Sequence, residues 1–265
     1  MPSLKPDSVS RLTPEEKARI SRILIQQRPG PSDLFAAAGL TPDPWQLRVL
    51  LSRAPRTLLL CSRQSGKSTT TAALACAAAI FERDALVLLL SPSLRQSGEL
   101  FRKVLSFYRS LPSAPRPIGD SALRLELSNG SRIVSLPGSE GTVRGFSGVR
   151  LLVVDEASRV PGGLYYAVRP MMAVSNGRLV ALTTPAGKRG WFYDAWQGAE
   201  PWERTRITAH DVPRISAAFL AEERRSMPAP WFAAEYMAEF TDSDGAFFRE
   251  SDIACLLYTS DAADE

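Results

Sequence analysis

Long apolar runs alternate with helical patterns along the chain from about residue 41 onward. Four runs lack the polar alternation of a half-exposed strand, and they lie at Thr57–Cys61, Ala85–Leu90, Leu151–Val154 and Arg178–Thr183. Such runs predict strands that are buried on both faces of a sheet. Residues with helical spacing lie before or between them, at Trp45–Leu51, Thr70–Ile80 and Leu94–Leu111. This order predicts an α/β fold with a mostly parallel sheet covered by helices on both faces.

Two shorter segments alternate between apolar and polar residues, and they predict a hairpin. Leu123–Leu127 and Ser131–Leu136 flank the tripeptide Ser128-Asn129-Gly130. An Asn-Gly pair readily adopts the positive backbone φ angles that a tight turn between antiparallel strands requires. The tripeptide is therefore the predicted turn.

The first 40 residues differ from the rest, and they predict a short helical lead-in. A helical pattern runs from Pro14 to Gln27, and Arg28–Pro31 ends it because two prolines and a glycine interrupt a helix. One or two further helical turns follow at Asp33–Gly39. We expect residues 1–40 to pack on a main domain that spans residues 41–240.

Composition narrows the class of protein. No run of about 18 apolar residues occurs that could span a membrane, and Met1–Asp7 lacks the apolar stretch of a signal peptide. We therefore expect a cytoplasmic protein. Cys61, Cys76 and Cys255 show neither metal-ligand spacing nor a disulfide framework. The net charge of +4 and the pI of about 9.1 permit contact with nucleic-acid phosphates without showing it.

The segment after the first apolar run has the features of a phosphate-binding loop. Residues 62–69, with the sequence Ser-Arg-Gln-Ser-Gly-Lys-Ser-Thr, join a strand to a helix. In that setting the backbone N–H groups of residues 63–66 and the helix N-terminus bind a phosphate. Cys61 stands where such loops usually begin with glycine. We expect the nucleotide to be bound by Gln64, Ser65, Gly66, Lys67, Ser68 and Thr69.

Three residues of this loop have distinct expected roles. Gly66 lets the backbone approach the nucleotide closely, and Lys67 reaches the β- and γ-phosphate oxygens. The hydroxyl of Ser68 ligates Mg²⁺. The loop therefore predicts a site for a nucleoside triphosphate.

Two acids at the end of the third apolar run complete this predicted site. Asp155 follows Leu151–Val154 at the carboxyl end of a strand, and we expect it to lie beside the loop and hold Mg²⁺, directly or through water. Glu156 is placed to polarise the attacking water as a general base. An acid pair after a strand is also a common helix start, but the loop upstream favours the catalytic interpretation. Together the two motifs predict a Mg²⁺-dependent ATPase.

Two further patterns are less specific. Thr183-Thr184-Pro185 ends the next strand, where a residue can sense the γ-phosphate, and a simple strand-ending turn is the alternative. The amide of Gln46 could read the adenine edge while Trp45 packs nearby. A buried aromatic side chain beside a capping amide explains that pair equally well.

Phosphoryl transfer benefits from an arginine close to the charge that develops on the γ-phosphate. Arg144, shortly before the acidic strand, is one candidate and could act from a neighbouring subunit. Arg63, inside the loop, is a second candidate from the same chain. Arginine is plentiful in this sequence, so position alone leaves a surface role for Arg144 equally open.

Eight motifs occur in the order of one known family. They are Pro-Trp-Gln at 44–46, Arg-Gln-Ser-Gly-Lys-Ser at 63–68, Ser-Pro-Ser-Leu-Arg-Gln-Ser at 91–97, Asn-Gly-Ser-Arg-Ile at 129–133, Val-Arg-Gly at 143–145, Val-Val-Asp-Glu-Ala at 153–157, Thr-Thr-Pro at 183–185 and Glu-Tyr-Met-Ala-Glu-Phe at 235–240. Over roughly residues 41 to 250, the chain resembles the large subunit of a tailed-phage terminase, the motor that packages viral DNA. The loop that starts with arginine and the Thr-Thr-Pro motif are fairly specific to that family.

The resemblance implies a RecA-like P-loop ATPase domain that uses ATP and Mg²⁺ and works as a homo-oligomeric ring, a pentamer. The implied partners are double-stranded DNA, the portal protein and the small terminase subunit. The implied location is the host cytoplasm, with transient docking on the procapsid. In that picture Arg63 resembles the family's loop arginine, and Arg144 resembles its proposed finger across the subunit boundary. Thr183, Thr184 and Pro185 resemble the motif that couples hydrolysis to DNA movement.

Members of that family also carry a C-terminal nuclease that uses clustered acids and divalent metal. No such cluster is evident in this sequence, and Asp242, Asp244 and Asp252 lie in residues 241–254, which we interpret as a hinge toward a missing nuclease domain. We therefore expect no nuclease activity. Residues 255–265 resemble the translation of a sequencing adapter, and we interpret them as a scar outside the fold.

Two other functions stay open at this point. A nucleic-acid helicase of the DEAD-like class shares the Asp-Glu-Ala motif and an upstream glutamine, but it needs a second RecA-like domain, for which the sequence after residue 190 has too few strand patterns. A scaffold that binds nucleotide without hydrolysing it is the other alternative. The complete set of Lys67, Ser68, Asp155 and Glu156 argues against a scaffold.

Overall fold

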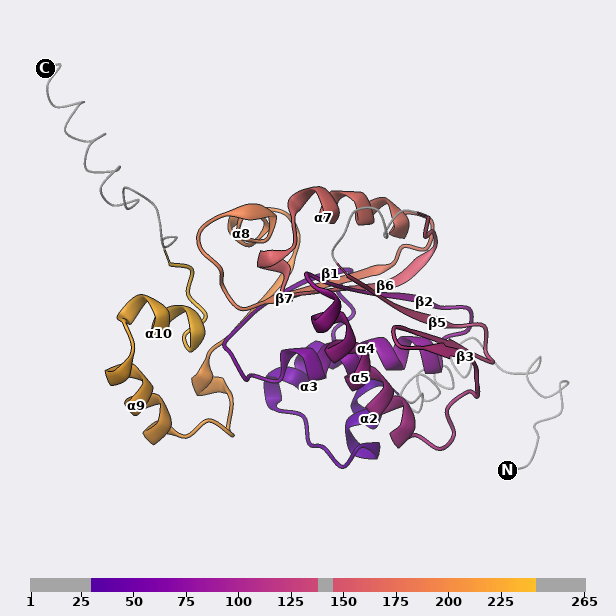
Figure 1. Cartoon of the computed structure of the whole chain (residues 1–265), viewed down its shortest axis with the longest axis horizontal. Coiled ribbons are helices and arrows are strands. Elements are labelled where there is room, and N and C mark those ends of the chain that lie inside the picture. The colour runs from indigo at the N-terminus through magenta and orange to yellow at the C-terminus, as the bar shows by residue number, and fades with distance from the viewer. Residues whose placement is uncertain (1–29, 138–144, 242–265) are drawn as a thin grey trace, which may run out of the picture.

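The computed structural model describes residues 30–137 and 145–241, which form an eight-stranded sheet with helices on both faces (Figure 1). The strands lie in the order β3-β4-β5-β2-β6-β7-β1-β8. Their bounds are β1 Arg56–Cys61, β2 Leu86–Ser91, β3 Pro117–Ser121, β4 Arg124–Leu127, β5 Arg132–Pro137, β6 Val149–Asp155, β7 Arg178–Thr183 and β8 Glu203–Ile207. The strands from β5 to β8 in this order are parallel, whereas β4 is antiparallel to β3 and β5. The predicted α/β fold with a mostly parallel sheet is confirmed.

The helices form a layer on each side of the sheet (Figure 1). One layer contains α2 Pro31–Ala37, α3 Pro44–Leu51, α4 Lys67–Phe81 and α5 Leu94–Ser110. The other contains α7 Gly162–Val168 and α8 Gly190–Gln197, while α9 Ala217–Ser226 and α10 Ala229–Glu235 lie to one side of the sheet. Short 3-10 turns occur at η2 Ala157–Arg159, η3 Arg169–Met172 and η4 Ala209–Asp211.

The helices expected between the strands are confirmed as α3, α4 and α5, and the turns expected after residue 33 are confirmed as α2. Leu34 and Phe35 of α2 are buried in the main core, where the ring of Phe35 lies 5.3 Å from that of Phe107. This part of the lead-in therefore packs on the main domain, as expected. The helix expected from Pro14 to Gln27 lies outside the described residues. In the described ranges, no helix combines the length and the apolar character that a membrane crossing requires.

Each helical layer encloses its own apolar core. Beneath α4 the core is built from small side chains, so this helix lies close to the sheet. They are Ala72, Ala73, Ala75, Cys76 and Ala79. Beneath α7 and α8 the core combines aliphatic with aromatic side chains, and Tyr165 stacks on Trp191 with ring centroids 3.8 Å apart. The sheet is therefore buried on both faces, which explains why its central strands are continuous apolar runs.

The predicted hairpin is confirmed as β4 and β5, and its turn also secures the end of α4. Gly130 has a φ of +84°, a conformation that glycine adopts without strain. The side-chain amide of Asn129 donates to the carbonyl oxygens of Ala79 (2.8 Å) and Glu82 (3.0 Å). The hydroxyl of Ser131 also donates to the Glu82 carbonyl oxygen. These bonds satisfy carbonyl groups that a helix end leaves without partners.

Two strands were missing from the sequence-based prediction, and both are edge strands. β3 contains Pro117 and Gly119 and is largely exposed, and β8 has the polar sequence Glu-Arg-Thr-Arg-Ile. An edge strand has one neighbour and an open side, so it does not need an apolar run. β8 nevertheless pairs with β1 from Thr57 to Cys61, directly before the phosphate-binding loop.

The tight packing of α5 makes a testable prediction about stability. Phe101 is 1% exposed between α5 and the sheet, whereas Phe219 on α9 is 44% exposed. Phe101→Ala leaves a cavity and should lower the free energy of unfolding by about 3–5 kcal/mol. Phe219→Ala removes the same atoms from a partly exposed site and should lower it by about 1 kcal/mol. Urea unfolding of both variants measures the difference, and equal losses would contradict the assigned core.

Candidate nucleotide-binding site

The predicted site residues gather where the parallel strands end. The register pairs Leu60 of β1 with Thr183 of β7, and Leu182 of β7 with Asp155 of β6. The loop after β1, the threonines at the end of β7 and the acids at the end of β6 therefore share one edge of the sheet. Asp155 lies beside the loop, as expected, although β7 stands between β6 and β1 in the sheet. Thr183 and Thr184, at the end of β7, therefore lie next to both the loop and the acids.

The loop has the open backbone donors that a phosphate needs. In the described part of the chain, the N–H groups of Gln64, Ser65 and Gly66 have no hydrogen-bond partner. Gln64 (φ +60°) and Gly66 (φ +92°) both adopt left-handed backbone conformations, and this conformation is strained for glutamine. The prediction for Arg63 was wrong on one point, because its N–H donates to the carbonyl oxygen of Glu235 (2.7 Å). The free donors thus begin at Gln64.

Lys67 is the central cation of the site. Its Nζ atom donates to the Thr184 hydroxyl (3.0 Å) and lies 3.2 Å from the Glu156 carboxylate. The lysine side chain is only 10% exposed. One ammonium group therefore connects the loop, the strand-end threonines and the acidic pair.

Ser68 and Asp155, the two predicted metal ligands, are neighbours. The Ser68 hydroxyl donates to Oδ2 of Asp155 over 3.4 Å, and Oδ1 of Asp155 accepts from the N–H of Glu156. Burial raises the pKa of Asp155 to about 6, the Glu156 charge adds to the rise, and the Lys67 charge opposes it. The site therefore holds an incompletely neutralised carboxylate.

Glu156 is fixed by two cations at a strained position. Its Oε1 faces Lys67, and its Oε2 accepts from NH1 of Arg159 (3.0 Å). The backbone of Glu156 is left-handed, with φ +49° and ψ +45°, which is uncommon for a non-glycine residue. Arg159 was not predicted, although its position three residues after Glu156 places it within reach.

The other predicted residues of the Thr-Thr-Pro motif are buried at the end of β7. Thr183 is fully buried, and its hydroxyl accepts from the N–H of Ser158, just after the acidic pair. Thr184 is bound to Lys67 as described, and Pro185 lines a cavity that opens beside it. The motif therefore contacts both halves of the site. Thr69 is half-buried in the first turn of α4.

The two arginine candidates differ in what can be described. Arg63 pairs with Glu235 of α10 through its guanidinium as well as its backbone. The loop is thereby attached to a helix that is far away in the sequence. Arg144 lies outside the described residues, so its finger role stays a prediction.

The side chain of Gln46 is engaged by the protein itself. Its Oε1 accepts from the N–H of Asp43 (2.8 Å), and its Nε2 donates to Thr70 Oγ1 (3.0 Å) and to the carbonyl oxygen of Gly66 (3.4 Å). Trp45 is 2% exposed and belongs to the core. These contacts match the alternative of a capping amide beside a buried aromatic ring, and adenine recognition by this pair stays a prediction.

A second arginine that the sequence did not reveal supports the loop. Arg214 donates from NH1 and NH2 to the two carboxylate oxygens of Asp43 (2.7 and 2.8 Å), and NH2 also lies 3.3 Å from the Ser65 carbonyl oxygen. Asp43 is 7% exposed, so its charge depends on this two-bond pair. Arg214 and Ser65 are 149 residues apart, and no local pattern indicates their contact.

The donor set fits a nucleoside triphosphate with a hard cation. Free N–H groups at a helix N-terminus together with Lys67 suit phosphate oxygens. The hydroxyl of Ser68 and the buried carboxylate of Asp155 are oxygen ligands of the kind that Mg²⁺ prefers. The raised pKa of Asp155 shows that a nearby positive charge would be favourable.

The sequence around this site matches a known family. Residues 58–255 match the model described as terminase large subunit, T4likevirus-type, N-terminal. The chain belongs to this terminase large-subunit family. The match covers the loop, the acidic pair and the Thr-Thr-Pro motif of this terminase chain, and the expected family resemblance is confirmed.

Solved structures share the fold. The large terminase ATPase domain of Thermus phage P74-26 is 24% identical with a TM-score of 0.68, and the match covers 81% of this chain and 100% of that one. The large terminase of a thermophilic bacteriophage is 16% identical with a TM-score of 0.63, and the match covers 76% of this chain and 54% of that one. The HK97 bacteriophage large terminase is 16% identical with a TM-score of 0.62, and the match covers 76% of this chain and 51% of that one.

These relatives support the RecA-like terminase ATPase fold for this chain. The large terminase of the thermophilic bacteriophage has been crystallised with ADP and with ATP-γ-S. The terminase chain described here spans about half the length of that protein and of the HK97 large terminase. No curated protein sequence matches it.

The raised pKa of Asp155 leads to a prediction about stability and pH. A free aspartate titrates near about 3.9, so the folded terminase chain holds this proton more tightly than the unfolded chain. The associated stability is complete below about pH 4 and is lost as the pH rises through about 6. Above that pH the buried charge lowers the free energy of unfolding by about 3 kcal/mol.

Asp155→Asn removes the charge and keeps the shape, so it should stabilise the chain at about pH 8. The gain should shrink toward zero at about pH 4, as the wild-type carboxyl becomes protonated in both states. Urea unfolding across this range, without nucleotide or divalent cation, measures it. Asp120→Asn on exposed β3 serves as the control and should show little change. A pH-independent gain would contradict the titration assigned to Asp155.

Proposed function

We propose that this chain is the Mg²⁺-dependent ATP-hydrolysing part of a motor that moves double-stranded viral DNA into a procapsid. The observation that carries the proposal is the position of Lys67, between Thr184 and Glu156 at the edge of the sheet. That position brings a phosphate-binding loop, a candidate base and a strand-end motif into one site. The nucleotides found with the large terminase of the thermophilic bacteriophage support ATP as the substrate.

Lys67 and the open N–H groups of the loop bind the phosphates of ATP. To do so, Lys67 exchanges Thr184 and Glu156 for phosphate oxygens, which frees Oε1 of Glu156. Mg²⁺, held by Ser68 and Asp155, would neutralise charge on the phosphates. Arg159 keeps Oε2 of Glu156 in place, so the released oxygen stays oriented.

Glu156 then acts as the general base. Its Oε1 accepts a proton from the attacking water while the water oxygen bonds to the γ-phosphorus. The bond from the γ-phosphorus to the bridging oxygen breaks, and its electron pair remains on ADP. The products are ADP and inorganic phosphate.

The exchange at Lys67 also supplies a link to movement. Thr184 gains or loses its lysine partner in each cycle, and it stands at the start of the segment that leads through Pro185 to α8. Arg63 connects the same loop to α10. Binding and release of nucleotide therefore act on two segments outside the sheet, which is what a coupling motif requires.

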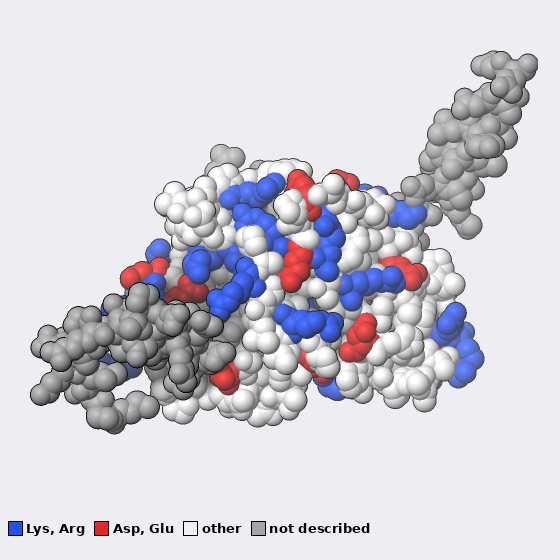
Figure 2. Space-filling model, turned by 180° about the vertical axis from the view of Figure 1, so that it is seen from behind, with Lys and Arg blue, Asp and Glu red and all other residues white. Residues whose placement is uncertain are grey.

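The remaining parts of the proposal extend beyond one chain. Arg144 would reach the γ-phosphate of a neighbouring subunit in a pentameric ring, docked on the portal in the host cytoplasm together with the small terminase subunit. Residues 41–240 would form the ATPase domain, and residues 241–254 a hinge toward a nuclease domain. Basic side chains cover much of the middle of one face, with acids interspersed, and this supports contact with DNA phosphates (Figure 2).

Glu156→Gln tests the central step. The variant keeps the shape of the side chain but cannot accept a proton, so ATP hydrolysis in the presence of double-stranded DNA should fall by more than about 100-fold. ATP should bind at least as tightly, because Lys67 no longer has to break an ion pair with a carboxylate before it contacts the phosphates. Phosphate production measures turnover, and displacement of a fluorescent ATP analogue measures binding.

Glu222→Gln on the exposed surface of α9 is the matched control and should retain both properties. High protein concentration favours the ring that the proposal requires. Turnover retained by Glu156→Gln would remove Glu156 from the role of base. Loss of ATP binding would show instead that Glu156 builds the loop.

A further inference from the structure

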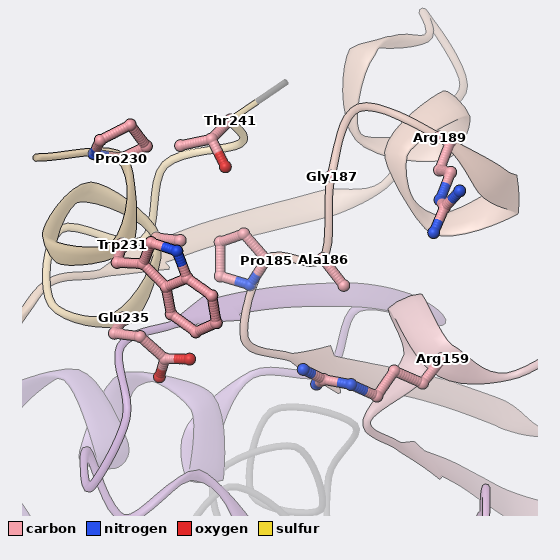
Figure 3. Close-up of a pocket in the computed structure, with 10 residues that line it drawn as sticks. Arg159, Pro185, Ala186, Gly187, Arg189, Pro230, Trp231, Glu235 and Thr241 are labelled. Carbon is pink, nitrogen blue, oxygen red and sulfur yellow. The ribbon is translucent and has the colours of Figure 1, made fainter. Parts of the chain in front are cut away.

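A cavity of about 250 Å³ opens next to the catalytic residues without containing them (Figure 3). Pro185 and the following loop form its floor, Trp231 and Glu235 of α10 face it from one side, and Arg159 and Arg189 reach it from the other. No role in the proposed reaction has yet been assigned to this space.

Three of its lining residues are one contact away from the catalytic groups. Arg159 is bound to Glu156, and Pro185 follows Thr184, the partner of Lys67. Glu235 is bound to Arg63 of the loop. Because these contacts come from three different segments, they place the cavity beside the end of the site where the water activated by Glu156 would attack the γ-phosphate.

The charges around the cavity do not balance. Arg159 is neutralised by Glu156, and Arg63 by Glu235. Arg189 is exposed and has no hydrogen-bond or ion-pair partner among residues 30–137 and 145–241. One positive charge is therefore left over at the wall of a hollow space. A second guanidinium from a neighbouring chain would meet like charge there, whereas an anion would meet an unused partner.

The lining also offers neutral donors. The N–H groups of Ala186 and Gly187 have no partner in the described ranges, and Gly187 has a φ of +76°. The hydroxyl of Thr241 and the indole N–H of Trp231 belong to the same lining. Donors of this kind, together with one free arginine, suit a small tetrahedral oxyanion.

We propose that this cavity binds the inorganic phosphate produced by hydrolysis, with Arg189 as its principal cation. The inference rests on the proposed function, since that reaction supplies the phosphate. Arg159 binds Glu156 and also lines the cavity, so a departing phosphate would meet the guanidinium of Arg159 before that of Arg189. The phosphate then leaves through the side of the domain that is lined by α10 and the loop after β7.

Phosphate binding can be measured without turnover. We would titrate the whole chain, saturated with ADP, with inorganic phosphate and follow the ³¹P line width. Arg189→Gln should raise the Kd for phosphate at least fivefold, and Arg189→Glu should abolish binding. Arg109→Gln, on the exposed side of α5, is the matched control and should stay within twofold of wild type. Equal affinities in all four proteins, or no binding to wild type, would overturn the assignment.

A second measurement separates this inference from the function on which it rests. In a single turnover, quenched-flow samples report cleavage of ATP, and a fluorescent phosphate-binding protein reports release. Arg189→Gln should leave the cleavage rate unchanged and alter the release rate at least threefold. If wild type does not cleave ATP, the proposed function fails, and the titration alone decides on the phosphate site. If cleavage and release are both unchanged in Arg189→Gln, the phosphate site fails while the ATPase stands.

Discussion

The burial of the sheet on both faces confines the polar chemistry of this domain to the ends of its strands. β2 is buried at every position, and β1 and β7 are buried at every position but the first. Charged groups therefore have room only where the chain leaves the sheet, and parallel strands leave it at one edge. This constraint gathers Lys67, Asp155 and Thr184 from three segments. The three residues are also largely buried, which strengthens their electrostatic interactions relative to those at an exposed surface.

The features with a local signal were accessible from the sequence. Apolar runs revealed the central strands, helical spacing revealed α3 to α5, and Asn129-Gly130 revealed the hairpin. The contacts among Lys67, Ser68, Asp155 and Glu156 also follow from motifs, because a loop after one strand and an acid pair after another meet wherever the strands share an edge. Each of these signals resides in fewer than about 20 consecutive residues.

The features without a local signal depend on how distant segments pack. β3 and β8 each bind one neighbour, so their sequences need no apolar face. The insertion of β7 between β6 and β1 is a property of the whole sheet. The pairs Arg214–Asp43 and Arg63–Glu235 join residues more than 170 positions apart, and either partner alone is an ordinary surface charge. Gln46 illustrates the same limit, because its motif alone does not reveal that its amide binds Thr70.

The turn of the hairpin restrains one end of α4, and the candidate site restrains the other. Asn129 and Ser131 bind carbonyl groups at the end of this helix, while Lys67 and Ser68 at its start belong to the candidate site. The helix has 15 residues and is therefore about 22 Å long. Because both ends are held by hydrogen bonds and its small side chains pack against the sheet, the helix has little freedom to bend or rotate. A displacement of Lys67 along the helix axis would therefore also displace the turn between β4 and β5, which lie toward the opposite edge of the sheet from β8.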